Sequence, residues 1–179
     1  EGTRYEFRVY AEAGAAPWQG IWSLAKHSVI IAPDSDLMIN ELQDAFNEYP
    51  NNGDWDDDYG LQCVDLYRWF IETYTSLTST SGNGQDCAGN LASTNEGLSI
   101  RSTPTAYSVF SSDGEEGIFG SYSEYGHTGI VISVDVSNKT CKVLHTGNSK
   151  QYDDPNSWIT TYPYDVSGVI FVDVSGYLD

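Results

Sequence analysis

The sequence predicts an α+β domain in which helices come first and an antiparallel β-sheet follows. Apolar residues recur at helical spacing between residues 34 and 77, and short apolar runs separated by turns follow residue 116. The chain has 179 residues with 40% hydrophobic side chains, which is enough to bury one sizeable core. Helices grouped before strands are typical of the α+β class.

Residues 1–32 are predicted to form a separate β-rich segment, and the main domain is predicted at 33–179. "TRYEFRVYAEA" alternates polar and apolar positions, and "IWSLAKHSVIIAP" is a second strand-like run. Together they resemble the last two strands of a fibronectin type III module, and "GTRYEFRVYAE" is the recognisable part. Two strands do not fold alone, so this segment either packs on the main domain or ends a preceding module.

Two helices are predicted in the main domain. The first covers residues 34–49, where an acidic or serine N-cap precedes an apolar stripe and "PNNGD" ends the pattern. The second covers residues 63–77, with apolar side chains on one side. Residues 79–97 are rich in Ser, Thr, Gly and Asn, so we predict a loop or flap there.

Four strands are predicted after the flap. They are "GIFGSY", "HTGIVISVDV", "CKVLHTG" and "GVIFVDV", separated by turns such as "SNKT". Because each run is short and the turns are tight, antiparallel pairing is favoured.

The strong negative charge excludes some classes of partner. Eight basic residues face 26 acidic ones, for a net charge of −18. Binding to nucleic acid or to an anionic membrane requires a basic surface, so neither is expected. No apolar run has the length of a membrane span. We expect a soluble, secreted protein in a calcium-containing medium, and a monomer.

An acidic loop, "DWDDDYGLQCVD", has the ligand spacing of an EF-hand-type calcium loop. Counted from residue 54, carboxylates occupy positions 1, 3, 5 and 12, and a glycine stands at position 7, which donates a backbone carbonyl. Tyr59 replaces the usual turn glycine, and an aspartate replaces the final glutamate. The alternative is a solvated acidic loop at a helix N-terminus. The predicted calcium ligands are Asp54, Asp56, Asp58, Gly60 and Asp65.

Cys63, next to this loop, is a candidate nucleophile. Neighbouring carboxylates raise a thiol's pKa, but a bound dication would offset them, and a helix N-terminus favours the thiolate. Gln62 could donate a hydrogen bond to an oxyanion. The alternative is a buried structural cysteine. The cysteine count of three is odd, and the pairing we predict is Cys87 with Cys141, leaving Cys63 free.

A catalytic thiol needs a base, and His127 is the first candidate. It lies in "YGHTGIVISV", at the start of an apolar strand and between glycines that let other backbone approach closely. His145 on the next strand is the fallback, and Asn148 could hold the second ring nitrogen of the base. His27 lies in the N-terminal segment. Spacing alone also fits structural histidines and a turn residue at Asn148.

Taken together, "DWDDDYGLQCVDL", "YGHTGIV" and a following strand that ends in "GN" resemble the CHAP family over residues 34–179. These are cysteine, histidine-dependent amidohydrolases/peptidases of phage endolysins and bacterial wall-remodelling enzymes. The resemblance implies a papain-like (NlpC/P60-related) fold, with the nucleophilic cysteine at a helix N-terminus facing a histidine on the sheet. It also implies hydrolysis of amide bonds in cell-wall peptidoglycan, and therefore action outside the cell, after secretion or phage delivery.

By position, the resemblance makes Cys63 the nucleophile, His127 the base and Asn148 the residue that orients the base. Many members bind calcium where the acidic loop stands. Many also place an acid two residues before the asparagine, where this chain has Thr146. Endopeptidase and N-acetylmuramoyl-L-alanine amidase activity both remain open. From another class, a catalytically inactive, calcium-stabilised binding module is the alternative.

Overall fold

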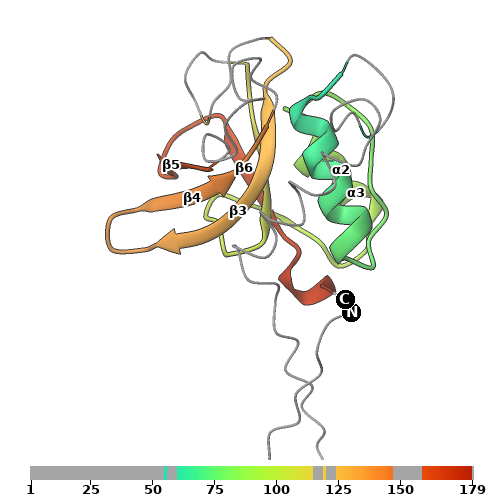
Figure 1. Ribbon diagram of the computed structural model, residues 1–179. Helices are drawn as coiled ribbons and strands as arrows, with labels where there is room; N and C mark the ends of the chain where they lie inside the picture. Colours follow the sequence, from blue (N-terminus) through green and yellow to red (C-terminus); the bar gives the residue numbers. More distant parts are fainter. Residues whose placement is uncertain (1–54, 56–59, 115–118, 120–123, 147–158, 179) are drawn as a thin grey trace, which may run out of the picture. The chain divides into compact units, whose positions relative to one another are not determined.

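The computed structural model describes Trp55, residues 60–114, Phe119, residues 124–146 and residues 159–178. Two α-helices in this part, α2 (Cys63–Tyr74) and α3 (Cys87–Thr94), lie beside a β-sheet (Figure 1). The combination of helices and an antiparallel sheet confirms the predicted α+β class. The strands are β1 (Ile100–Arg101), β2 (Ser108–Ser112), β3 (His127–Asp135), β4 (Thr140–Leu144), β5 (Ile159–Pro163) and β6 (Val169–Asp173).

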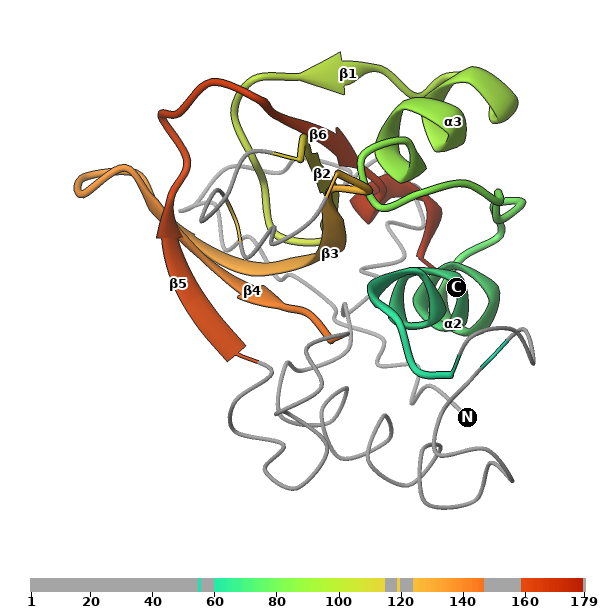
Figure 2. The same cartoon turned by 90° about the horizontal axis from the view of Figure 1, so that it is seen from above.

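Every strand pair in this sheet is antiparallel, and the order is β1-β6-β2-β3-β4-β5. Val109 on β2 lies opposite Ile130 on β3 and opposite Val172 on β6. The register shifts between Val131 and Ser133, which marks an irregularity in β3. Seen from above, β4 and β5 curve away from the helices, while β2, β3 and β6 lie next to them (Figure 2).

Alternation along β2 assigns one face of the sheet to the helices. The Ser111 hydroxyl accepts a hydrogen bond from the backbone N–H of Ala88 at 2.9 Å and donates one to the carbonyl of Gly84 at 2.7 Å. Val109 points the same way, because side chains two residues apart share a face of a strand. The start of α3 is therefore attached to the middle of the sheet.

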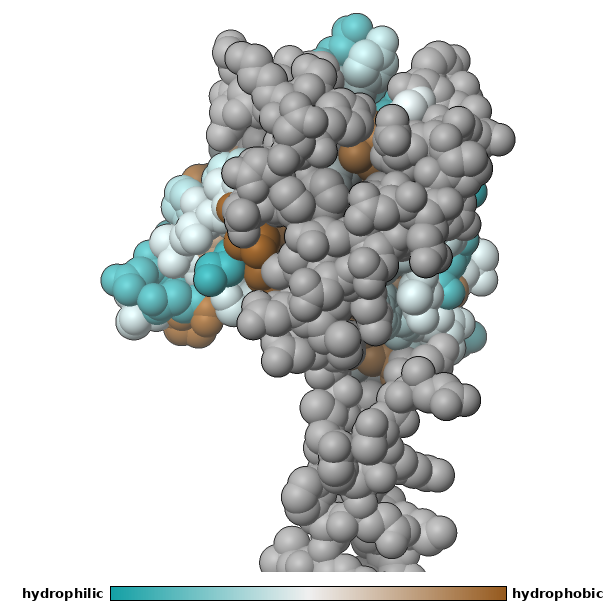
Figure 3. Space-filling model, viewed as in Figure 1, coloured by the Kyte–Doolittle hydropathy of each residue, from teal (hydrophilic) through white to brown (hydrophobic). Residues whose placement is uncertain are grey.

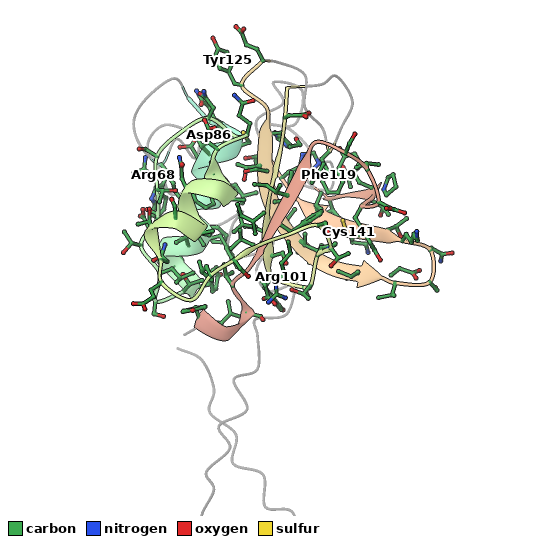
Figure 4. All side chains as sticks on the ribbon, turned by 180° about the vertical axis from the view of Figure 1, so that it is seen from behind. Arg68, Asp86, Arg101, Phe119, Tyr125 and Cys141 are labelled. Atoms are coloured by element: carbon green, nitrogen blue, oxygen red, sulfur yellow. The ribbon has the colours of Figure 1, made fainter. Side chains whose placement is uncertain are left out.

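The opposite face carries an aromatic cluster. The ring of Phe119 lies 5.1 Å from that of Phe110, 5.7 Å from that of Phe171 and 5.0 Å from that of Tyr162. Burying each such side chain stabilises the fold by about 2 kcal/mol. Figure 4 shows Phe119 and Cys141 among the strands, whereas Arg68 and Asp86 lie on the helical side. The buried members are Phe110, Phe119, Val131, Cys141, Val143, Tyr164, Val169 and Phe171.

The helix predicted at residues 63–77 exists but ends three residues earlier. Thr75 adopts an extended conformation and pairs with Leu178 in an isolated β-bridge. The N–H of Ser76 donates to the carbonyl of Tyr177 at 3.0 Å. This pairing with residues near the end of the chain replaces the last helical turn.

The prediction of a loop or flap throughout residues 79–97 was wrong, because α3 forms within it. Cys87, Ala88 and Leu91 are fully buried, so packing against the sheet stabilises a helix that its Ser- and Asn-rich composition does not favour. Strands β1, β2 and β5 were also missed. The first helix (34–49), the N-terminal segment (1–32) and all of "GIFGSY" except Phe119 lie outside the described residues, so these predictions, and the division at residue 33, stay predictions.

The described surface has no large apolar patch on the face shown in Figure 3, where brown areas are small and separate. The large hydrophobic side chains that are exposed among the described residues are Ile100, Tyr125, Val136 and Val166. None of the described helices is long and apolar enough to cross a membrane.

Candidate active site

The N-terminus of α2 is held by Asp65. Its carboxylate accepts hydrogen bonds from the backbone N–H of Gln62 at 2.6 Å and from that of Trp55 at 2.8 Å. Gln62 is the extended N-cap residue, and Asp65 is the third residue of the helix, 1% exposed. A carboxylate at this position stabilises the helix start and fixes the loop that precedes it. Cys63 is therefore presented by an anchored helix terminus.

The predicted calcium site is only partly within the described residues. Asp54, Asp56 and Asp58 lie outside them, whereas Gly60 and Asp65 lie inside. Gly60 has a φ of +73°, the left-handed conformation that lets a loop reverse direction. Both Asp65 oxygens accept backbone N–H hydrogen bonds, so the role that the described residues give this carboxylate is to cap the helix. The described residues contain no cluster of three or more His, Cys, Asp or Glu side chains suited to a metal.

The Cys63 thiol contacts the beginning of β3. It is half-buried, and the backbone of Thr128 forms a hydrogen bond with it. Desolvation by burial raises the pKa of the thiol to about 11, and the negative charge of Asp65 adds to this rise. Hydrogen bonds from the backbone of Thr128, Cys63 and Val64 lower the pKa in part. The helix N-terminus therefore acts as predicted, but burial outweighs it, and the resting thiol is neutral.

His127, the residue before Thr128, is the first link of a hydrogen-bonded chain. Its Nε2 lies 2.9 Å from Nδ1 of His145, and Nε2 of His145 lies 2.9 Å from the hydroxyl of Thr160 on β5. The histidine side chains are buried, with 7% and 5% exposed. Burial, with a contribution from His145, lowers the pKa of His127 to about 3, and burial lowers that of His145 to about 4. Both rings are therefore neutral at pH 7.

Thr146 contributes to the site at a place other than the one we predicted from the resemblance. Its hydroxyl donates to the backbone carbonyl of Gln62 at 3.0 Å and so connects the end of β4 to the start of α2. The position next to the base is taken by His145. The sequence analysis had considered His145 only as a fallback base, although it ends an apolar strand near His127.

Two glycines leave room for this arrangement. A Cβ atom at Gly84 would lie 2.7 Å from Cα of His127, so the loop before α3 contacts the backbone of the candidate base directly. A Cβ atom at Gly129 would lie 2.5 Å from the carbonyl oxygen of Leu144 and 3.0 Å from Cβ of His145. The close approach of β4 to β3 therefore depends on a glycine at this position.

The structure brings Gln62, Cys63 and His127 to one region through α2 and β3, and adds His145 and Thr160. Within the described ranges, no hydrogen bond joins the thiol of Cys63 to the ring of His127; the backbone of Thr128 connects the two positions. Catalytic hydrogen bonds are often long before substrate binds. Asn148 and His27 lie outside the described residues. No sequence signal pointed to Thr160.

The predicted disulfide is wrong. Cys63, Cys87 and Cys141 are all free. Cys87 begins α3 on the helical face of the sheet, while Cys141 belongs to the aromatic cluster on the opposite face, so the sheet separates them. Figure 4 shows Cys141 on the strand side of the molecule. Because Cys87 and Cys141 are fully buried, Cys63 is the cysteine of the three with access to solvent.

Comparison with known proteins identifies the family. The family model of the CHAP domain matches residues 50–148, which is more than half of the chain. The chain belongs to the CHAP family. The match confirms the resemblance found in the sequence, and CHAP domains are generally hydrolytic amidases or peptidases. Cys63, His127 and His145 lie within the matched residues, whereas Thr160 lies beyond them.

Solved structures give a more distant likeness to this CHAP domain. The crystal structure of Ly7917 is 14% identical, covers 62% of this chain and 52% of its own chain, and has a TM-score of 0.38. The crystal structure of Ly7917 with the hydrolyzing product of MDP is also 14% identical, covers 63% and 53%, and has a TM-score of 0.38. The chain thus matches about half the length of each. No curated protein matches it.

Proposed function

We propose that this CHAP domain hydrolyses amide bonds in the peptide stems or cross-bridges of peptidoglycan, with Cys63 as the nucleophile. The observation that carries the proposal is the hydrogen bond from the backbone of Thr128 to Cys63. It fixes a helix-terminal thiol beside the strand residue that follows His127. A nucleophile and a base held on separate rigid elements are what covalent catalysis requires.

His127 serves as the general base through Nδ1, because Nε2 faces His145. The thiol is neutral at rest, so its proton passes to Nδ1 as the sulfur–carbon bond to the scissile carbonyl forms. The protonated ring then gives this proton to the leaving nitrogen as the C–N bond breaks. Water cleaves the resulting thioester, releasing a carboxylic acid and restoring the thiol.

The oxyanion is stabilised by the start of α2. The backbone N–H of Cys63 and the side-chain amide of Gln62 are the donors we assign, since fixed donors next to the nucleophile lower the energy of the tetrahedral intermediate. Thr146 supports this role indirectly, because its hydrogen bond to the Gln62 carbonyl fixes the N-cap residue. Asn148 remains a predicted orienting residue from the family resemblance.

Calcium is proposed as a structural ion of the loop before α2, with Asp54, Asp56, Asp58, Gly60 and Asp65 as ligands. Its chemistry is charge neutralisation. It offsets the carboxylates next to Cys63 and orders the loop that Asp65 already anchors through Trp55 and Gln62. The ion is proposed as structural, and no reaction step is assigned to it.

The alternative from another class is an inactive calcium-stabilised binding module. The raised pKa of Cys63, caused mainly by burial, is the observation that favours it. The aligned His127–His145 pair opposes it, because a binding module has no need of two buried histidines joined end to end.

Turbidity loss of purified Gram-positive sacculi tests the proposal, with the parent and Cys63→Ala each assayed in calcium and in EGTA. We expect clearing that needs both Cys63 and calcium. Clearing by Cys63→Ala equal to the parent refutes the nucleophile, and clearing that survives EGTA refutes the calcium requirement alone.

The masses of the released fragments identify the bond. New amino groups on stem or bridge residues, with the amide bond between the lactyl group and the stem intact, indicate an endopeptidase. Free lactyl groups on glycan strands indicate the amidase alternative.

A further inference from the structure

We infer that His145 and Thr160 form a positioning relay that sets the tautomer of His127, in place of a carboxylate partner. The inference rests on the proposed function. His127 Nε2, His145 Nδ1, His145 Nε2 and the Thr160 hydroxyl are joined by two consecutive contacts of 2.9 Å. His127 begins β3, His145 directly follows β4 and Thr160 lies on β5, so the relay connects three neighbouring strands.

The relay works in one direction of hydrogen bonding. A neutral imidazole carries its proton on one nitrogen, and Nδ1 of His127 must be unprotonated to accept the proton of the thiol. The N–H at Nε2 of His127 then donates to Nδ1 of His145. The N–H at Nε2 of His145 donates in turn to the hydroxyl oxygen of Thr160. Thr160 gives the last N–H an acceptor, so no buried ring N–H is left unpaired.

The same geometry assigns the contact with Nε2 of His127 to His145 rather than to Thr146. Nε2 of His127 carries one hydrogen, and His145 already accepts it at 2.9 Å. The hydroxyl of Thr146 is used by the carbonyl of Gln62. Gly129 permits the relay, because any side chain there would displace His145 and the end of β4.

Electrostatics distinguishes this relay from a carboxylate–histidine pair. A carboxylate stabilises the imidazolium that forms during the reaction, whereas a second neutral imidazole stabilises it less. The titratable groups that the described elements place around the two rings are Cys63 on α2, Cys87 on α3 and Tyr162 on β5. Burial raises the pKa of the Cys63 and Cys87 thiols, so neither carries a negative charge at pH 7, and burial together with His145 keeps the pKa of His127 low.

Steady-state kinetics on soluble muropeptides across pH 2.5–9 tests the relay. Thr160→Val keeps the shape of the side chain but removes the hydroxyl, and we expect kcat to fall roughly 10-fold with KM unchanged. Thr160→Ser should restore kcat to within about threefold of the parent. Thr161→Val is the matched control: this exposed threonine is the next residue on the strand, and its variant should match the parent.

His145→Glu separates positioning from packing. A carboxylate next to His127 should move the acid limb of kcat/KM upward by about one pH unit or more, because it favours the charged ring. A side chain that only fills space would lower stability without moving this limb.

The inference is overturned if Thr160→Val and Thr161→Val behave alike, or if His145→Glu leaves the acid limb in place. Either result, obtained while hydrolysis still requires Cys63, leaves the proposed function intact. Loss of Cys63 dependence removes both.

Discussion

Acidification should destabilise this domain through its two buried histidines. The pKa of each is lowered, that of His127 to about 3 by burial and by His145, and that of His145 to about 4 by burial. The unfolded chain therefore binds more protons than the folded chain as the pH falls below 6.5. The stability that the neutral rings contribute is complete above pH 6.5 and is lost between pH 6.5 and about 3.

At pH 5 both rings are still neutral in the folded state, so the loss in the free energy of unfolding can be calculated from protonation of the unfolded state alone. Proton uptake by one unfolded imidazole lowers the free energy of the unfolded state by about 2 kcal/mol between pH 7.5 and pH 5. Two histidines give about 4 kcal/mol. Since domains are stable by only about 5–15 kcal/mol, this loss should be easy to measure.

Urea denaturation of the parent and of His127→Gln/His145→Gln at pH 7.5, 6 and 5 gives the measurement. The double variant keeps every carboxylate and His27, so the difference between the two pH dependences isolates the pair. We expect the parent to lose about 4 kcal/mol more than the variant. Equal losses would show that the rings are solvated and that the buried relay is incorrect.

Three further changes have defined outcomes. Gly84→Ala should lower the free energy of unfolding by about 1–3 kcal/mol and reduce hydrolysis, because the new Cβ would lie 2.7 Å from the backbone of His127. Thermal unfolding and kcat measure this, and a variant that matches the parent in both would show that the loop does not contact β3. Ser112→Ala should be neutral or stabilising in the same melts, because the buried Ser112 hydroxyl oxygen has no hydrogen-bond partner among the described residues, and a loss above about 1 kcal/mol would contradict this. The rate at which iodoacetamide labels Cys63, measured by peptide mass mapping, should rise about tenfold per pH unit from pH 7 to 9, because burial raises the pKa of the thiol to about 11. A labelling rate that levels off below pH 8 would show an activated thiolate instead.

Much of the architecture was predictable from local patterns. The helix that starts at Cys63 and the strand that starts at His127 follow from apolar spacing, and both exist nearly as predicted. The CHAP-like motifs around Cys63 and His127 predicted a helix for Cys63 and a facing strand for His127. Strand β4 was also predicted, with its end near His145.

Other features depend on tertiary contacts that spacing does not reveal. Helix α3 forms because Cys87, Ala88 and Leu91 are buried against the sheet, despite a composition typical of a loop. The partner of His127 depends on the register between β3 and β4 and on the lack of a side chain at Gly129.

Thr160 joins the site only because β5 pairs with β4, and β5 has no strong alternation of its own. The pKa of Cys63 was misjudged for a related reason. The dipole of the helix is visible in the sequence, whereas the depth of burial that outweighs it is a property of the packed fold.

The central claim is that Cys63 carries the hydrolysis. The most direct measurement is the initial rate of fragment release from soluble muropeptides by the parent, Cys63→Ala and Cys87→Ala, each normalised to folded protein. Cys63 and Cys87 both begin helices and both lie against Thr128, so the pair is matched in position. The account predicts a loss of at least about 10³-fold for Cys63→Ala and a rate within about tenfold of the parent for Cys87→Ala. Equal rates for the parent and Cys63→Ala, or equal losses in the two variants, would contradict it.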